Sequence, residues 1–177
     1  AGMLRAGLAA PAEGETWRAS SGTAAVLGLR ATPMDAAPTT AYLMLGARCL
    51  QNCAFCAQAR DSLADEAALS RVLWPAYPRD EVARAVAAAA DEGAIRRACF
   101  QVTVGPHHVA RTEDAVHRLA AATSVPICAS VAPRDLADVD GELLPDRFIE
   151  AIGLANGRDL LGRRVLTCER RRGITRQ

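Results

Sequence analysis

The feature that most constrains the fold of this chain is a repeated alternation of strand-like and helix-like segments over residues 39–132. The strand-like segments are short apolar runs with β-branched or aromatic members, whereas the helix-like segments place apolar residues three and four positions apart. Gly93 is the expected stop of the first helix, and Thr112 is the expected N-terminal cap of the second. We expect strands at 39–46, 97–104 and 125–132, and helices at 78–94 and 111–124. Three βα units in a row predict an α/β fold with parallel strands and right-handed crossovers.

Two further segments flank this repeat. Residues 1–38 are rich in Ala, Gly, Thr and Pro and form an N-terminal helical and loop preface, with one short helix expected at 22–30. A fourth strand near 148–155 has a blurred pattern, and the α/β unit is expected to span residues 39–155. Residues 156–177 lose strand and helix periodicity and form an irregular Arg-rich tail.

The bulk composition limits the classes of function. The 177 residues are 50% hydrophobic and 23% charged, which suits one globular domain rather than a membrane protein or a disordered tail. A net charge of +1 and an aromatic content of 4% give no basic field or stacking platform for nucleic acid. The apolar stretch in MLRAGLAAPA, near the start, is shorter than the roughly 7–15 residues of a secretory core, so a cytoplasmic protein is expected. In a reducing cytosol, clustered cysteines are more often metal ligands or redox groups than disulfides.

Three of the six cysteines lie within eight residues, in the segment CLQNCAFC. Cys49, Cys53 and Cys56 follow the first expected strand at its carboxyl end, where parallel α/β folds place their chemistry. If this loop winds in a helical sense, offsets of four and three residues put the sulfurs on one side, with Cβ atoms roughly 5–6 Å apart. Such a triangle can bind three irons of a 4Fe-4S cube. Because no fourth cysteine lies nearby, the fourth iron would stay open to a small molecule.

With Phe55 between the second and third cysteines, this segment resembles the signature of the radical S-adenosylmethionine (SAM) superfamily, Cx3CxφC, in which φ is aromatic. The resemblance implies that the three cysteines hold a 4Fe-4S cluster, that SAM chelates its open iron, and that Phe55 lies against the adenine. It also implies a flavodoxin- or ferredoxin-type electron donor. Reductive cleavage of SAM would then give methionine and a 5'-deoxyadenosyl radical that abstracts hydrogen from a substrate carbon.

A wider resemblance, to biotin synthase and its related proteins, covers about residues 39–135. It is carried by AYLMLGARCLQNCAFCAQARDS, LSRVLWP, RACFQVTV and PICASVAP. It implies a partial (β/α) barrel of the TIM type, insertion of sulfur into a substrate, and a second, 2Fe-2S cluster as sulfur donor, for which Cys99 and Cys128 are candidate ligands. The sequence departs from that pattern, because the further Cys and Arg ligands from later strands have no placeable counterpart and the Gly-rich motif after the second strand is absent.

Other interpretations of the same residues stay open. A Cys-x2-Cys pair is a common half of a zinc site, and Cys99 and Cys128 could simply pack as small hydrophobic side chains. Among enzymes, the alternative is a lipoyl-synthase-like protein that works with a partner radical SAM chain on an acyl group held by a carrier. Outside enzymes, an inactive metal-binding fragment would carry the same motif.

The number of βα units sets an expectation for the whole chain. A complete (β/α) barrel takes about 250 residues, and only three units are clear here, so about half a barrel is expected. Half a barrel leaves two open edges of parallel strand, which favour aggregation or pairing with another chain. We therefore expect the chain alone to be poorly soluble or oligomeric.

Overall fold

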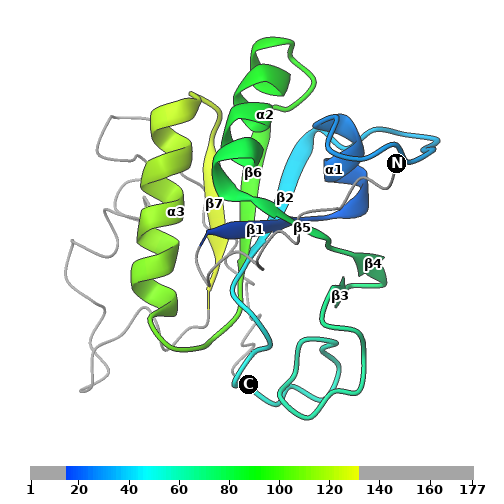
Figure 1. Ribbon diagram of the computed structural model, residues 1–177, viewed down its shortest axis with the longest axis vertical. Helices are drawn as coiled ribbons and strands as arrows, with labels where there is room; N and C mark the ends of the chain where they lie inside the picture. Colours follow the sequence, from blue (N-terminus) through cyan, green and yellow to red (C-terminus); the bar gives the residue numbers. More distant parts are fainter. Residues whose placement is uncertain (1–14, 132–177) are drawn as a thin grey trace, which may run out of the picture.

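The computed structural model describes residues 15–131, and its centre is a five-stranded mixed sheet (Figure 1). The elements in chain order are β1 (Thr16–Ala19), α1 (Ser21–Val26), β2 (Thr40–Leu45), β3 (Ala68–Leu69), β4 (Val72–Leu73), β5 (Ala76–Pro78), α2 (Arg79–Asp91), β6 (Arg97–Val102), α3 (His108–Ala122) and β7 (Ile127–Ser130). The order of strands in the sheet is β5-β1-β2-β6-β7, and β3 and β4 form a separate two-stranded sheet. The fourth strand expected near 148–155 and the Arg-rich tail lie outside the described residues.

The strands β2, β6 and β7 are parallel neighbours, with Tyr42 opposite Cys99 and Cys99 opposite Cys128. The helices α2 and α3 lie side by side against one face of the sheet, with α2 over β1 and β5 and α3 over β2, β6 and β7 (Figure 1). The predicted α/β class and the parallel order of these three strands are therefore confirmed. Within residues 15–131 the sheet is open and does not close into a barrel, since β5 and β7 stand at its two ends.

The edge of β2 is covered by a strand that the sequence pattern did not predict. β1 pairs antiparallel with β2, where Arg18 faces Met44, and also with β5, where Trp17 faces Tyr77. The expectation of two open parallel edges is therefore wrong at β2, because part of the N-terminal segment completes the sheet there. At the other end, β7 pairs only with β6 among the strands that the structure describes.

The core lies between the sheet and the two long helices. Phe100 of β6 is fully buried, and its ring meets that of Trp17 edge-on, with centroids 5.2 Å apart and an interplanar angle of 77°. Val86 of α2 and Leu119 of α3 are fully buried in the same cluster. Complete burial of such a side chain stabilises the fold by about 1.5–3 kcal/mol, so this face of the sheet fixes how the strands are placed.

Of the two helix ends predicted from the sequence, the structure confirms one and contradicts the other. After α2, Gly93 adopts a positive φ of 74°, which confirms it as the expected stop. The prediction that Thr112 caps α3 is wrong, because the helix begins at His108 after a left-handed His107. Thr112 lies in the second turn, where its hydroxyl donates to the His108 carbonyl oxygen at 2.7 Å. A threonine can make this bond only when the preceding turn is already helical.

Candidate functional site

The three clustered cysteines lie in a long loop, residues 46–67, which we call the cysteine loop. It leaves β2 at Gly46, whose φ is 91°, and it runs beside the end of β6. The Leu50 N–H donates to the Val104 carbonyl at 2.8 Å, and the Cys49 N–H donates to the Gln58 carbonyl at 3.0 Å. The loop therefore lies at the carboxyl ends of two neighbouring parallel strands, which is the edge where α/β folds bind ligands.

The three thiols are free and differ in exposure, since Cys53 is exposed while Cys49 and Cys56 are half-buried. The Cys49 sulfur accepts the N–H groups of Gln51 at 3.4 Å and of Val104 at 3.3 Å. The Cys56 N–H donates to the Cys53 carbonyl at 3.0 Å, so these two cysteines flank a single turn. Backbone N–H groups that point at sulfur are typical of iron-sulfur sites, so the donor chemistry fits such a cluster.

The loop does not wind as a helix, so the condition under which the sulfurs would share one side is not met. It consists of turns and bends between β2 and β3. Across residues 15–131, no group of three or more His, Cys, Asp or Glu side chains is close enough to hold a metal ion. A cluster on Cys49, Cys53 and Cys56 therefore requires the loop to draw its sulfurs closer together.

Phe55 lies at the tip of the turn between Cys53 and Cys56, and 82% of it is exposed. Leu50 and Leu63 of the same loop are also exposed. Aromatic rings bury a large area when they meet a partner, so an exposed phenyl ring beside the thiols is available to a planar ligand. The fold itself gains little from this ring.

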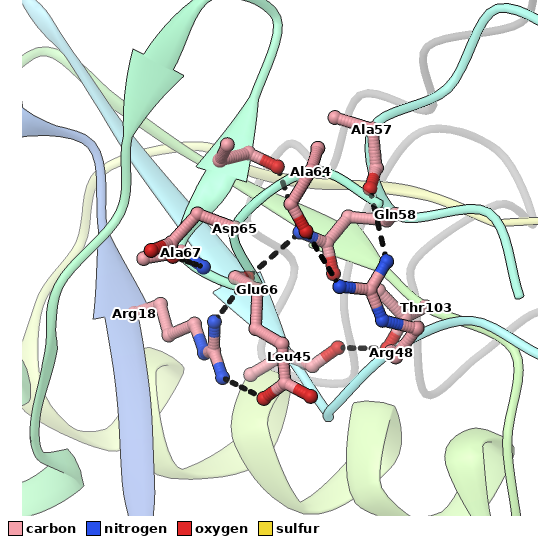
Figure 2. A network of polar contacts seen from close by, with 11 residues as sticks. Arg18, Leu45, Arg48, Ala57, Gln58, Ala64, Asp65, Glu66, Ala67 and Thr103 are labelled. Carbon is pink, nitrogen blue, oxygen red and sulfur yellow. Dashed lines mark hydrogen bonds and ion pairs between the residues drawn. The ribbon is translucent and has the colours of Figure 1, made fainter. Parts of the chain in front are cut away.

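Arg48 organises the backbone of the cysteine loop (Figure 2). Its guanidinium donates to the carbonyls of Ala57 and Ala59, each at 3.3 Å, and to that of Ala64 at 2.7 Å. No motif or period in the sequence singles out this residue. Its only signal there is an Arg directly before the first cysteine, in a loop otherwise rich in alanine.

Gln58 is a second residue that holds the loop backbone and that no sequence motif singles out. Its side chain is buried, with 2% exposed. Its side-chain amide donates to the carbonyls of Glu66 at 2.8 Å and Ala68 at 2.7 Å (Figure 2). Arg18 of β1 donates to the same Glu66 carbonyl and forms an ion pair of 4.0 Å with the Glu66 carboxylate. These contacts join the end of the loop to the sheet.

Cys99 and Cys128 are brought together, as register partners on β6 and β7, and each is 5% exposed. The Gln101 amide donates to the Cys99 sulfur at 3.4 Å and to the Ser130 hydroxyl at 3.3 Å. The hydrogen bond with Cys128 lowers the pKa of the Cys99 thiol to about 7, helped by Ser130 and Gln101 and opposed by burial. The two cysteines alternate with core residues such as Phe100, so they lie on the sheet face turned away from α2 and α3. The pair can supply two thiolates to one ligand.

A shallow groove on the other side of the sheet contains none of the five described cysteines. It lies between α2 and α3, where Arg118 pairs with Asp80 at 3.0 Å and with Asp114 at 3.6 Å. Its lining consists of Asp80, Ala83, Arg84, Asp114, His117, Arg118, Ala121 and Ala122. Surface ion pairs of this kind contribute little to stability.

Comparison with known proteins adds no relative. In the part of the chain that the structure describes, no helix combines the length and apolar character needed to cross a membrane. Searches against protein-family models, curated proteins and solved structures find no match in any of the three.

Proposed function

We propose that this protein is a radical SAM enzyme that binds a 4Fe-4S cluster through Cys49, Cys53 and Cys56 within a partial (β/α) barrel. The observation that carries the proposal is the position of these three free thiols in one loop at the carboxyl ends of β2 and β6. Three thiolates leave one iron without a protein ligand, which is what coordination of a small molecule at that iron requires. A closed electron-transfer site would need a fourth cysteine at similar spacing.

The chain's own residues have separate tasks in this proposal. The N–H groups of Gln51 and Val104 donate to the sulfur of Cys49, the first of the three proposed ligands. The exposed ring of Phe55 would lie against the adenine of SAM. When bound, the cluster and SAM supply the electron transfer and the activation of an unreactive carbon-hydrogen bond.

Within this class, we propose sulfur insertion of the biotin synthase type, on a small-molecule substrate. The contact between Cys99 and Cys128 supports it, because two paired thiols can provide part of a sulfur-donating 2Fe-2S site. A lipoyl-synthase-like reaction on a carrier-bound acyl group uses the same loop and is the alternative among enzymes. A fragment that binds metal without turnover is the alternative outside enzymes.

The test is anaerobic reconstitution with iron and sulfide, followed by SAM and a strong reductant. We expect about four irons per chain from the loop, and 5'-deoxyadenosine is the product that is assayed as the sign of SAM cleavage. Replacement of any one of Cys49, Cys53 and Cys56 by Ala should remove the cube. Iron content unchanged in all three single variants would refute the assignment, and stoichiometric zinc without iron would favour the inactive fragment.

The sulfur-donor role has its own experiment. Joint replacement of Cys99 and Cys128 by Ala should lower the iron content by about two per chain and leave SAM cleavage intact, because the cube is held elsewhere. Equal iron in the parent and the double variant would assign both cysteines to packing.

A further inference from the structure

We propose that Arg48 and Gln58 are positioning residues that fix the backbone of the cysteine loop before any metal binds. Neither residue is a cluster ligand in the proposed function. Their role is to hold both ends of the segment that carries the thiols, so that the thiols are presented from one defined backbone. The role in cluster uptake rests on the proposed function, whereas the role in fixing the loop does not.

The Arg48 guanidinium donates its hydrogen bonds to the backbone of the cysteine loop. Its three acceptors are backbone carbonyls of Ala57, Ala59 and Ala64, and no ion pair involves it in the described part of the chain. Carbonyls in a loop without helix or strand have no ladder partners, and a part-buried carbonyl left unpaired is unfavourable. A planar guanidinium carries five donors in a fixed fork, so one side chain can satisfy several carbonyls at defined angles.

Gln58 is tied through both its backbone and its side chain. Its carbonyl accepts the Cys49 N–H, and its amide nitrogen donates to Glu66 and Ala68. The amide oxygen is buried and has no partner among the described residues. An unpaired buried acceptor is unfavourable, so the favourable contribution of this side chain comes from the two bonds that its amide nitrogen donates.

Two further contacts anchor the loop to the sheet, one on each side. Arg18 of β1 donates to the Glu66 carbonyl that Gln58 also uses (Figure 2). On the other side, the Leu50 N–H of the loop donates to the Val104 carbonyl at 2.8 Å, just beyond the end of β6. The loop is thus fastened to β1 and to the end of β6.

This arrangement limits how much of the loop must move to gather three sulfurs. Cys49 is held by the Gln58 carbonyl, and the Arg48 guanidinium holds the backbone on both sides of Gln58. The remaining arc, residues 50–56, carries the exposed Cys53 and the half-buried Cys56. A short arc with fixed ends has few conformations, so little entropy is lost when its thiols converge.

The decisive measurement is amide hydrogen exchange of the full chain without metal. In Arg48→Met and Gln58→Met, we expect the amides of the cysteine loop to exchange at least about tenfold faster, because hydrogen bonds to part-buried carbonyls are lost. The amides of β2 and β6 should keep their protection. Arg60→Met is the matched control, because Arg60 lies in the same loop but is exposed and pairs only with the neighbouring Asp61 among the described carboxylates. Arg48→Lys should lie between Arg48→Met and the parent chain, since lysine keeps the charge but lacks the fork.

Anaerobic uptake of iron and sulfide gives a second readout. Arg48→Met should take up iron several-fold more slowly than the parent and the Arg60→Met control, and the electron paramagnetic resonance signal of its reduced cluster should be heterogeneous. If the parent chain itself takes up no iron, the proposed function fails, and the exchange data alone decide the positioning role. Loop exchange equal to the parent in both methionine variants would overturn the proposal. So would loss of protection throughout the sheet in Arg48→Met, Gln58→Met and Arg48→Lys alike, because it would indicate a general structural role.

Discussion

At the scale of single residues, Cys99 links the chemistry of a side chain to the stability of the fold. Its pKa falls from an ordinary value of 9.0 to about 7, mainly because of the hydrogen bond with Cys128. At a pH between about 7 and 9.0, the Cys99 thiol has lost its proton in the folded chain but still keeps it in the unfolded chain. The free energy of unfolding therefore rises as the pH increases from about 7 to 9, and this contribution is lost as the pH falls through 7.

We predict that the metal-free chain is more stable at pH 9 than at pH 7, and that Cys99→Ser reduces this difference. The substitution removes the titrating thiol and leaves the neighbouring side chains in place. Denaturant-induced unfolding at the two pH values measures the effect. An equal change with pH in both proteins would contradict the assigned shift.

Phe55 is a residue for which stability and binding should respond differently. Because its ring is 82% exposed, we predict that Phe55→Ala changes the free energy of unfolding by less than about 0.5 kcal/mol. If the proposed function is right, the same substitution keeps the cluster but weakens SAM binding by about two- to tenfold, since an aromatic contact contributes about 0.5–1.5 kcal/mol beyond its area. Thermal unfolding and a SAM titration measure the two quantities, and an unchanged SAM dissociation constant would remove Phe55 from the site.

At the scale of elements, the helices and parallel strands of the βα repeat were predictable, and the short antiparallel strands outside it were not. The observed β2, β6, β7 and α2 fall inside their expected ranges, while α3 begins three residues before its expected start. β1 and β5 have four and three residues, so their pairing depends on tertiary register rather than on a sequence period. The β3–β4 turn uses positive φ at Ser70 and Arg71, which lack the usual Gly or Asn signal.

The candidate site was predictable to a similar degree. The position of the thiols after β2 follows from their spacing and from the preceding strand pattern. The contacts of Arg48 do not, because it reaches carbonyls up to 16 positions away, and no periodicity encodes such contacts. The closeness of Cys99 and Cys128 was implied by the parallel order and required only the correct register.

The end of β2 depends on a close approach that only glycine allows. A Cβ at Gly46 would lie 2.4 Å from the Thr103 hydroxyl and 2.7 Å from an Arg111 guanidinium nitrogen, at a φ of 91°. We predict that Gly46→Ala destabilises the fold by at least about 2 kcal/mol, from backbone strain and overpacking together. Gly28→Ala is the control, because Gly28 has a φ of 68° but nothing within 4 Å of its Cβ position, so only the backbone part of about 1 kcal/mol remains. Equal losses in the two variants, measured by denaturant unfolding, would show that the contacts at Gly46 relax freely.

At the scale of the whole molecule, β1 and β5 connect the sheet to the region beyond the cysteine loop. Trp17 is buried in the sheet core, whereas Trp74 is buried beside the β3–β4 hairpin, where its indole N–H donates to the Leu69 carbonyl at 2.9 Å. The Ala19 N–H donates to the Pro75 carbonyl at 3.1 Å, which joins the two regions directly. The two tryptophans therefore report on separate parts of one connected structure.

We predict that these two regions unfold as one cooperative unit. In Trp17→Phe the fluorescence reports on the loop region, and in Trp74→Phe it reports on the sheet. Within each variant, the fluorescence midpoint should coincide with the midpoint from circular dichroism, which reports on the whole backbone. A lower fluorescence midpoint in Trp17→Phe would show that the cysteine loop and hairpin open by themselves.

The strand order also determines where the length of this chain can change without disturbing the sheet. The chain leaves the sheet at Leu45 and returns at Ala76, in two strands that are both paired with β1. Because β1 sets the positions of both exits, the segment between them can grow or shrink without moving the register of the sheet, and each doubling of its length costs only about 0.6 kcal/mol. The segment between Leu45 and Ala76 is therefore the part of the sheet's connections whose length can change at the smallest cost to the core.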